Sequence, residues 1–280
     1  MGIELNEKIN RSLKLLKSVK SDEIELCYSG GKDSDVILEL AKLSGIPYRA
    51  IYKKTTIDPP GTIKHCRNNG VEIYEPKISF LDLIKQRGFP TMRCRFCCDE
   101  LKEYKILDNA IQGIRRCESI KRMKNYKEPV ICRIYGNKAS HVNVILPILE
   151  WTDKDISDFV KMQNIQCHPL YYIKTKCTDI VFDVKKRLGC LGCPLKSDKG
   201  LSDFKAYPLL VKAWIKAGQE WWDQPRQKPI ASHAKFESIY DLFVHNIFFD
   251  SYESFSLAKE GIFGKMDCKD ALERYFKITL

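Results

Sequence analysis

Residues 23–38 read Glu23-Ile-Glu-Leu-Cys-Tyr-Ser-Gly-Gly-Lys-Asp-Ser-Asp-Val-Ile-Leu38, and this stretch decides the fold. A short apolar run ends at Tyr28, seven glycine or polar residues follow, and an apolar pattern with helical spacing starts at Val36. This order predicts a strand, a glycine-rich turn and a helix. Such a turn directs backbone N–H groups and the positive end of a helix dipole at one point, which favours a bound phosphate.

The turn itself has the composition of a phosphate-binding loop. Gly30 and Gly31 let the backbone approach a ligand closely, and Lys32 adds a mobile positive charge. The spacing matches neither Gly-x-x-x-x-Gly-Lys-Ser/Thr nor Gly-x-Gly-x-x-Gly. Two alternatives stay open: the turn binds no ligand, or Asp33 serves only to cap the following helix. The candidate nucleotide-binding residues are Ser29, Gly30, Gly31, Lys32, Asp33 and Ser34.

Length and composition describe a folded, basic protein. The 280 residues are 44% hydrophobic, enough for one large domain or a domain with an appendage. Lysine and arginine number 47 against 36 acidic residues, so the formal net charge is +11. This excess favours a polyanionic partner, either a nucleotide or a nucleic acid, although a merely basic soluble enzyme fits equally well.

The sequence predicts a cytoplasmic protein without membrane segments. Its first residues lack the apolar core of a signal peptide, and no run approaches the roughly 20 apolar residues that span a bilayer. In a reducing compartment, the twelve cysteines indicate metal, cluster or redox chemistry rather than a disulfide framework.

Strand-like and helix-like segments alternate along the chain. The alternation predicts an α/β fold with a mainly parallel sheet and flanking helices, in which ligands bind beyond the carboxyl ends of the strands. We expect a nucleotide-binding domain over residues 1–200 and a helical, aromatic-rich C-terminal extension over residues 201–280. The expected strands are 24–28, 48–52, 71–74, 130–135 and 141–147, and the expected helices include 5–19, 62–69, 79–87, 100–110 and 152–162.

Two short cysteine clusters form the second strong signal. They are Cys94-Arg-Phe-Cys97-Cys98 and Cys190-Leu-Gly-Cys193, and a fold can bring two such clusters to one metal centre. Thiolates select an iron–sulfur cluster or zinc, and the bare spacing fits both. Unrelated buried cysteines are the remaining alternative. We interpret the isolated cysteines as small core residues; these are Cys27, Cys66, Cys117, Cys132, Cys167, Cys177 and Cys268.

Several motifs resemble one known family. The loop at Ser29 resembles the pyrophosphate loop of the adenine-nucleotide α-hydrolase, or ATP-pyrophosphatase, superfamily. Residues 113–122, 147–155 and 168–171 look like the phosphoadenosine phosphosulfate (PAPS) reductase family. The paired cysteines resemble those of assimilatory adenylylsulfate reductases, where they ligate a [4Fe–4S] cluster. The chain is therefore identified as a PAPS-reductase-family member of the iron–sulfur type, over roughly residues 22–200.

The resemblance assigns roles to residues of this chain. The loop residues would hold the phosphates of ATP or a related adenine nucleotide with Mg²⁺, and Lys32 and Asp33 would be catalytic. Arg115 and Arg122 would neutralise phosphate or sulfate, unless they only belong to a solvated basic face. The implied ligands of a [4Fe–4S] cluster, or alternatively of zinc, are Cys97, Cys98, Cys190 and Cys193.

The chain departs from the reductases at one place. Their nucleophile lies in a C-terminal Glu-Cys-Gly-x-His segment, whereas Cys268 lies in Met-Asp-Cys-Lys-Asp. The loop is intact, which resembles iron–sulfur ATP pyrophosphatases of DNA phosphorothioation and, more generally, tRNA-thiolating enzymes. We therefore predict ATP pyrophosphatase activity coupled to sulfur transfer, with a sulfur donor protein and a nucleic-acid acceptor. The alternatives are a sulfonucleotide reductase that uses an external thiol such as thioredoxin, and a non-catalytic nucleotide- or nucleic-acid-binding protein.

Overall fold

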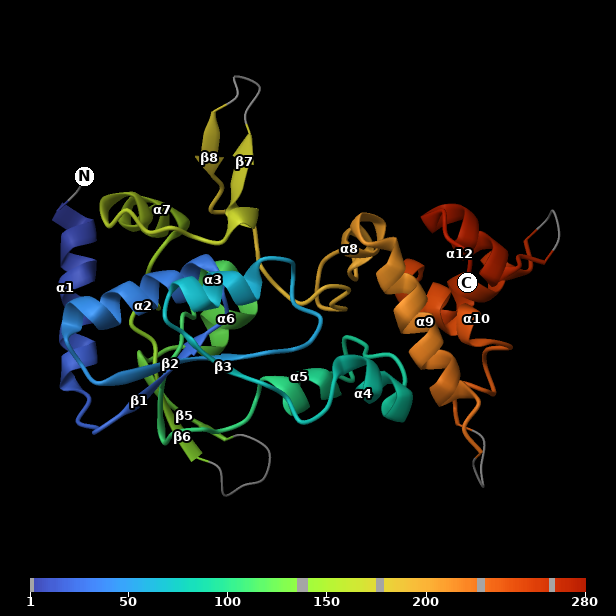
Figure 1. Ribbon diagram of the computed structural model, residues 1–280, viewed down its shortest axis with the longest axis horizontal. Helices are drawn as coiled ribbons and strands as arrows, with labels where there is room; N and C mark the ends of the chain where they lie inside the picture. Colours follow the sequence, from blue (N-terminus) through green and yellow to red (C-terminus); the bar gives the residue numbers. More distant parts are fainter. Residues whose placement is uncertain (1–2, 135–140, 175–178, 226–229, 262–264) are drawn as a thin grey trace. The chain divides into compact units, whose positions relative to one another are not determined.

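The computed structural model describes residues 3–134, 141–174, 179–225, 230–261 and 265–280 (Figure 1). The chain forms two compact units that interleave along the sequence. The first unit comprises residues 1–54, 58–76 and 101–189, and the second comprises residues 55–57, 77–100 and 190–280. Neither unit is therefore one continuous segment of the chain.

The first unit is built on a six-stranded sheet with the order β3-β2-β1-β4-β6-β5. Neighbouring strands are parallel except β5 and β6, which are antiparallel. The predicted α/β class with a mainly parallel sheet is confirmed. The strands are β1 Ile24–Tyr28, β2 Tyr48–Lys53, β3 Glu72–Tyr74, β4 Asn109–Ile111, β5 Val130–Ile134 and β6 His141–Ile145, and a separate hairpin consists of β7 Tyr172–Lys174 and β8 Ile180–Phe182.

Strand β1 lies at the point where the direction of winding changes. The chain runs from β1 outward to β2 and β3, and it returns on the other side of β1 as β4. Leu26 is opposite Ala50 of β2 and Ile111 of β4, so β1 is paired on both edges. A crevice at the carboxyl ends of β1 and β4 is where sheets of this kind bind ligands.

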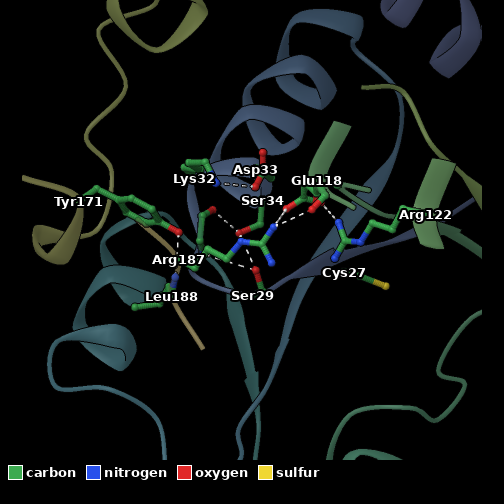
Figure 2. Close-up of a pocket in the computed structure, with 12 residues that line it drawn as sticks. Cys27, Ser29, Lys32, Asp33, Ser34, Glu118, Arg122, Tyr171, Arg187 and Leu188 are labelled. Atoms are coloured by element: carbon green, nitrogen blue, oxygen red, sulfur yellow. Dashed lines mark hydrogen bonds and ion pairs between the residues drawn. The ribbon is translucent and has the colours of Figure 1, made fainter. Parts of the chain in front are cut away.

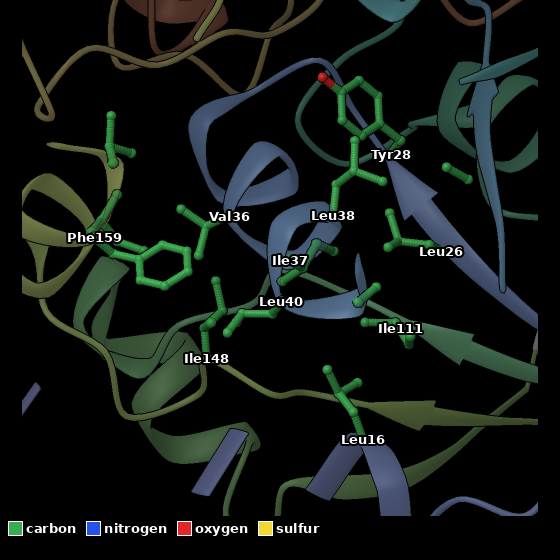
Figure 3. Packing of buried hydrophobic residues seen from close by; sticks show 14 of the residues in the cluster. Leu16, Leu26, Tyr28, Val36, Ile37, Leu38, Leu40, Ile111, Ile148 and Phe159 are labelled. Carbon is green, nitrogen blue, oxygen red and sulfur yellow. The ribbon is translucent and has the colours of Figure 1, made fainter. Parts of the chain in front are cut away.

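Helices cover the sheet of the first unit and bury its main core. Helix α2 contacts α1, α7 and β1, and Figure 3 shows the apolar side chains between them. Leu16, Leu26, Ile37, Leu40 and Phe159 are completely buried, and each such side chain contributes about 1.5–3 kcal/mol to folding. The helices are α1 Ile3–Ser18, α2 Lys32–Ser44, α3 Thr62–Asn68, α6 Ile120–Asn125 and α7 Asp153–Met162, with the 3₁₀ turns η1 Arg116–Glu118 and η2 Pro169–Tyr171.

One predicted helix is wrong. Residues 100–110 do not form a helix: α5 spans Phe96–Leu101, a turn follows, and the chain then forms β4 at Asn109–Ile111. Ala110 and Ile111 are completely buried because β4 pairs with β1 on one side and β6 on the other. The apolar spacing fits a helix locally, but a central position in the sheet outweighs that preference.

The second unit is helical, as predicted for the C-terminal part of the chain. Its core is aromatic: Trp214 contacts Phe80 and Phe204 with ring centroids 4.9 and 5.2 Å apart, and Phe204 contacts Phe243 at 5.4 Å. None of the helices in the described residues is long and apolar enough to cross a bilayer. The helices are α4 Phe80–Arg87, α5 Phe96–Leu101, α8 Leu201–Ala206, α9 Pro208–Trp222, α10 Ile239–Phe248, α11 Tyr252–Lys259 and α12 Cys268–Phe276.

A buried polar cluster fixes the first turn of α2. The Asp35 carboxylate accepts a hydrogen bond from the Tyr28 hydroxyl, and its Oδ1 lies 2.9 Å from Nε2 of His65 in α3. The His65 ring packs against His168, with ring centroids 5.6 Å apart. Burial, together with repulsion from His65, lowers the pKa of His168 from its ordinary value near 6.5 to about 4.

We predict that protonation of His168 destabilises the fold. A depressed histidine pKa contributes stability that is present above about pH 6.5 and is lost as the pH falls through 4, on the order of 2–3 kcal/mol. Urea unfolding at pH 8 and pH 4.5 measures the loss. The His168→Asn variant, which retains an acceptor for the N–H of Leu170, should lose less stability over the same range. Equal losses in both proteins would contradict the assignment.

Candidate functional site

The phosphate-loop candidates line a cavity of about 210 Å³ in the first unit, at the carboxyl end of β1 (Figure 2). The predicted residues Ser29, Gly31, Lys32, Asp33 and Ser34 all border it, together with Arg122. The full lining is Cys27, Ser29, Gly31, Lys32, Asp33, Ser34, Gly113, Glu118, Arg122, Tyr171, Arg187 and Leu188. The structure therefore gathers most of the predicted nucleotide-binding residues at one place, and nucleotide binding itself stays a prediction.

The loop presents the start of α2 to this cavity. Gly31 is the N-cap of α2, and among the described residues no side chain caps the helix there. Gly30 has φ +75°, a left-handed conformation that glycine adopts without strain. The Ser34 hydroxyl donates to the carbonyl of Gly31 at 2.7 Å, which closes the turn. Backbone N–H groups at an uncapped helix start are free to donate hydrogen bonds to a bound anion.

Charged side chains of both signs surround the cavity. Lys32 Nζ is 3.0 Å from Asp33 Oδ2 and lies 5.6 Å from the centre of the Tyr171 ring, and only 3% of Lys32 is exposed. Arg122 forms an ion pair with Glu118, and burial and repulsion from Arg187 lower the pKa of Arg122. Three cations therefore border the cavity against the carboxylates of Asp33 and Glu118.

Arg115 has a different environment from the one expected for a phosphate ligand. Its guanidinium is 1% exposed and lies 2.7 Å from Asp33 Oδ1 and 2.9 Å from Asp153 Oδ1. Burial opposes its charge, but the carboxylate of Asp33, the thiol of Cys117 and the carboxylate of Asp153 outweigh burial and raise its pKa. Arg115 is not among the described residues that border the cavity. Its geometry suits orientation of Asp33 rather than contact with a phosphate.

Half of the residues that line the cavity were not predicted from the sequence, and they include Glu118, Tyr171 and Arg187. Arg187 lies in a short run of basic residues that matches no motif, and Glu118, next to Cys117, is not part of a spacing pattern either. Tyr171 belongs to the stretch 168–171 that resembles the reductase family, but the sequence assigned it no role. Its hydroxyl accepts a hydrogen bond from the N–H of Leu188 at 3.2 Å and thereby holds the segment next to Arg187. These residues come from segments far apart in the sequence, so no local pattern singles them out.

A second cavity, of about 190 Å³, adjoins the first. Both are bordered by Cys27 and Ser29, and the second continues along β2 past Ile51 and Tyr52. Burial and the charge of Glu25 raise the pKa of Cys27 to about 12, so its thiol stays protonated at neutral pH. The two cavities therefore share part of their wall.

The second unit contains all four predicted metal ligands. Cys97 and Cys98 lie in α5, and Cys190 and Cys193 lie in the loop that precedes α8; each is partly exposed. A hydrogen bond with Cys98, burial, and the charges of Cys98, Cys190 and Cys193 raise the pKa of Cys97. Thiols that impede each other's ionisation in this way lie close together.

These cysteines fit a thiolate metal centre in donor type. Among the described residues, however, no group of three or more His, Cys, Asp or Glu side chains has the arrangement of a metal site. Four neighbouring thiols are the donor set of iron–sulfur clusters and structural zinc, and metal binding would remove their protons. The metal centre therefore stays a prediction.

The Asp203 carboxylate and close backbone packing hold the Cys190–Cys193 loop in a defined shape. Asp203 accepts the N–H of Gly192 at 2.8 Å and pairs with Lys196 at 2.6 Å. Gly192 has φ +67°, and a Cβ on Gly200 would lie 2.6 Å from the backbone of Gly192. The loop and the start of α8 are thus in direct contact, a packing that only glycine permits at both positions.

The isolated cysteines differ in their surroundings. Cys66, Cys167 and Cys268 are buried, which confirms their interpretation as small core residues, and Cys27 is half-buried. Cys117 and Cys132 are exposed, so the interpretation is wrong for these two. Cys177 lies outside the described residues.

Comparison with known proteins identifies related sequences. Residues 23–196 match the family model described as the phosphoadenosine phosphosulfate reductase domain. An uncharacterized 37.8 kDa protein in the gpa 5′ region of Escherichia phage 186 is 29% identical over 140 residues. That alignment covers 44% of this chain and 37% of the phage protein, so the chain spans well under half of this relative.

The chain is also remotely similar to proteins of known structure whose names refer to nucleotides or to tRNA. Phosphoadenylyl-sulfate reductase from Candida auris, in a phosphate complex, is 15% identical over 61% of this chain and 91% of its own, with a TM-score of 0.42. U34-tRNA thiolase NcsA from Methanococcus maripaludis, with its [4Fe–4S] cluster, is 16% identical over 81% and 82%, with a TM-score of 0.41. FMN adenylyltransferase from Candida glabrata is 16% identical over 64% and 62%, also at 0.41. Our family assignment rests on residues 23–196 alone.

The contact between Gly200 and Gly192 predicts a selective loss of stability. Gly200→Ala places a Cβ against backbone at a residue with φ +82°, so we expect a loss of at least about 2 kcal/mol in free energy of unfolding. Gly189→Ala is the matched control, because no described atom lies within 4 Å of its Cβ position, and it should cost no more than about 0.5 kcal/mol. Urea denaturation measures both, and equal stabilities would refute the close packing.

Proposed function

Because this chain belongs to the phosphoadenosine phosphosulfate reductase domain family, we propose that it is an enzyme that cleaves ATP to AMP and pyrophosphate and activates an acceptor for sulfur transfer. One observation carries the proposal. The uncapped start of α2 and the cations of Lys32, Arg122 and Arg187 converge on one cavity of about 210 Å³. That volume suits a pyrophosphate group, and the adjoining cavity along β2 provides room for the nucleoside.

The proposed reaction has two steps. An acceptor oxygen attacks the α-phosphorus of ATP, the bond between the α- and β-phosphates breaks, and pyrophosphate leaves. The acceptor then carries the adenylate on its oxygen. Hydrosulfide from a sulfur donor protein attacks the activated atom of the acceptor, and AMP leaves with that oxygen. Negative charge develops on the departing pyrophosphate, and it is this charge that the cavity stabilises.

Each loop residue has a role in this scheme. Lys32 and the N–H groups at the start of α2 neutralise the leaving pyrophosphate, and Arg122 and Arg187 contact its outer oxygens. Asp33, which Arg115 holds at 2.7 Å, provides the carboxylate for a Mg²⁺ ion that accompanies ATP. Arg115 is therefore a positioning residue in this proposal, not a phosphate ligand.

The four cysteines of the second unit would hold a [4Fe–4S] cluster, with zinc as the alternative metal. Cys97, Cys98, Cys190 and Cys193 supply four soft sulfur donors, the set that both centres use. When bound, an iron–sulfur cluster supplies a centre that accepts sulfur ligands and electrons. The loop around Cys190 is held by Asp203 and by the N–H of Leu191, which donates to the carbonyl of Ile57 at 2.8 Å.

A nucleic-acid acceptor is the third part of the proposal. Helix α6 follows Glu118 and Ser119 directly and exposes Ile120 and Met123 beside Lys121 and Lys124. An exposed basic helix next to the residues that line the cavity suits a polyanionic acceptor. The formal charge of +11 supports the same class of acceptor.

The buried state of Cys268 favours ATP cleavage over reduction of a sulfonucleotide by an internal thiol. Cys268 is the only cysteine after Cys193 in the sequence, and it is 3% exposed. Burial, a hydrogen bond with Asp241 and the charge of that residue raise its pKa to about 12. A nucleophilic cysteine needs access and a low pKa. Cys268 therefore does not suit this role, and the alternative of a reductase uses an external thiol such as thioredoxin.

Anaerobic assays of the purified protein test the activity. We expect release of AMP and pyrophosphate from ATP in the presence of nucleic acid, and Lys32→Ala should lower the rate by about 100-fold through loss of transition-state charge stabilisation. Lys42→Ala is the control, because it removes an exposed lysine of the same helix that pairs with Glu39. Thioredoxin-dependent sulfite release from PAPS or adenylylsulfate, without pyrophosphate release from ATP, would favour the reductase. Nucleotide binding without either turnover would favour a non-catalytic protein.

Metal analysis of the same protein tests the cysteine assignment. Cys190→Ser should lose bound iron together with the visible absorption of a cluster, because one of four thiolate ligands is missing. Cys132→Ser, which replaces an exposed cysteine of the first unit, should keep both. A zinc content in place of iron would select the alternative metal, and unchanged metal in Cys190→Ser would overturn the ligand set.

A further inference from the structure

A carboxylate occupies the arginine-lined side of the proposed phosphate cavity. The side chain of Glu118 is only 10% exposed, forms an ion pair with Arg122, and has its Oε1 3.8 Å from Nη2 of Arg187. Nη2 of Arg187 also donates to the main-chain carbonyl of Glu118 at 3.1 Å. Figure 2 shows Glu118 between these two guanidinium groups, facing the cavity that Lys32 borders from the other side.

An acidic residue opposes the binding of an anion at this place. The cavity has three cations, Lys32, Arg122 and Arg187, and Lys32 is compensated by Asp33 at 3.0 Å. The remaining two arginines face Glu118. The Arg187 side chain is 65% exposed and that of Arg122 is 36% exposed, so both guanidinium groups lie at the open side of the cavity, where their like charges repel each other. The nearly buried carboxylate of Glu118 provides the anion that compensates this repulsion.

We propose that Glu118 is an internal substitute for phosphate: its carboxylate occupies the arginine pair in the empty site, and the polyphosphate of the nucleotide displaces it on binding. This inference rests on the proposed binding of ATP at this cavity. It assigns Glu118 a positioning role, because the residue acts through Arg122 and Arg187 and not on the reacting atoms.

The exchange follows from the strength of the competing interactions. A tethered carboxylate competes at a high effective concentration, so a weak anion that makes one contact does not displace it. A pyrophosphate group gains the loop N–H groups and Lys32 in addition to both arginines, and this larger set of contacts outweighs the Glu118 pairs. The carboxylate thus keeps the arginines in place in the empty protein and selects for an extended polyphosphate.

The test is anion binding by the full-length protein, measured by titration calorimetry with inorganic pyrophosphate at 0.15 M salt. Glu118→Gln removes the competing charge and keeps the size of the side chain. We expect it to bind pyrophosphate about fivefold more tightly than the unmodified protein. Glu150→Gln breaks the neighbouring surface pair with Arg116 and should leave the affinity unchanged.

Thermal unfolding gives a second readout that does not depend on activity. Without Glu118 the arginine pair has lost its anion, so the melting temperature of Glu118→Gln should fall, and saturating pyrophosphate should raise it by more than in the unmodified protein. A double mutant with Arg122→Gln should show a smaller gain in affinity from Glu118→Gln, because the carboxylate acts through that arginine.

The outcomes separate this inference from the proposed function. Pyrophosphate bound equally or less tightly by a folded Glu118→Gln protein would overturn the role of Glu118 even where ATP turnover is present. Tighter binding by Glu118→Gln in a protein that never cleaves ATP would support the inference and contradict the enzymatic proposal. Absence of pyrophosphate binding in both proteins would overturn both.

Discussion

Parallel pairing of β1 with β2 on one edge and β4 on the other fixes where the chain turns into α2, and the geometry of the candidate site follows from that position. The turn lies at the carboxyl end of a central strand, so the first N–H groups of α2 point away from the core. The bonds from Asp35 to Tyr28 and His65 hold that first turn in place. Gly113, beyond β4, approaches so closely that a Cβ there would lie 3.0 Å from the carbonyl of Asp33.

Charge pairing then decides what each side chain near the loop is able to do. Arg115 is enclosed between Asp33 and Asp153, so its charge is already compensated and its contribution is to orient Asp33. Arg187 is more exposed and faces the cavity, where its partner is Glu118. The guanidinium of Arg115, which is paired with two carboxylates, therefore contributes to the structure of the site. The guanidinium of Arg187 is available to a ligand if, as we propose, Glu118 can be displaced.

The local parts of this site were predictable from the sequence, and the long-range parts were not. Ser29 to Ser34 form a contiguous strand–turn–helix signal, so their place followed from the pattern of residues 23–38 alone. The roles of Arg115 and Glu118 depend on partners outside that stretch. Residues 109–111 form a strand because they pair with β1 on one side and with β6 on the other. Spacing along the chain does not contain that information, because it arises when segments distant in sequence meet.

The cysteines illustrate the same limit and add a consequence for folding. Cys98 lies two residues before Glu100, where one segment of the second unit ends, and Cys190 is the first residue of the next segment. The residues between these two segments, 101–189, belong to the first unit. A metal bound by both pairs would close that long loop, and closing a long loop removes much conformational entropy from the unfolded chain. If the four cysteines bind one metal, that metal joins two segments of the second unit. These segments are far apart in the sequence, and among the described residues no strand pairing connects them. A metal centre would add to the contacts that already join residues 77–100 to residues 190–280, which include aromatic packing around Trp214 and an ion pair between Lys85 and Glu220.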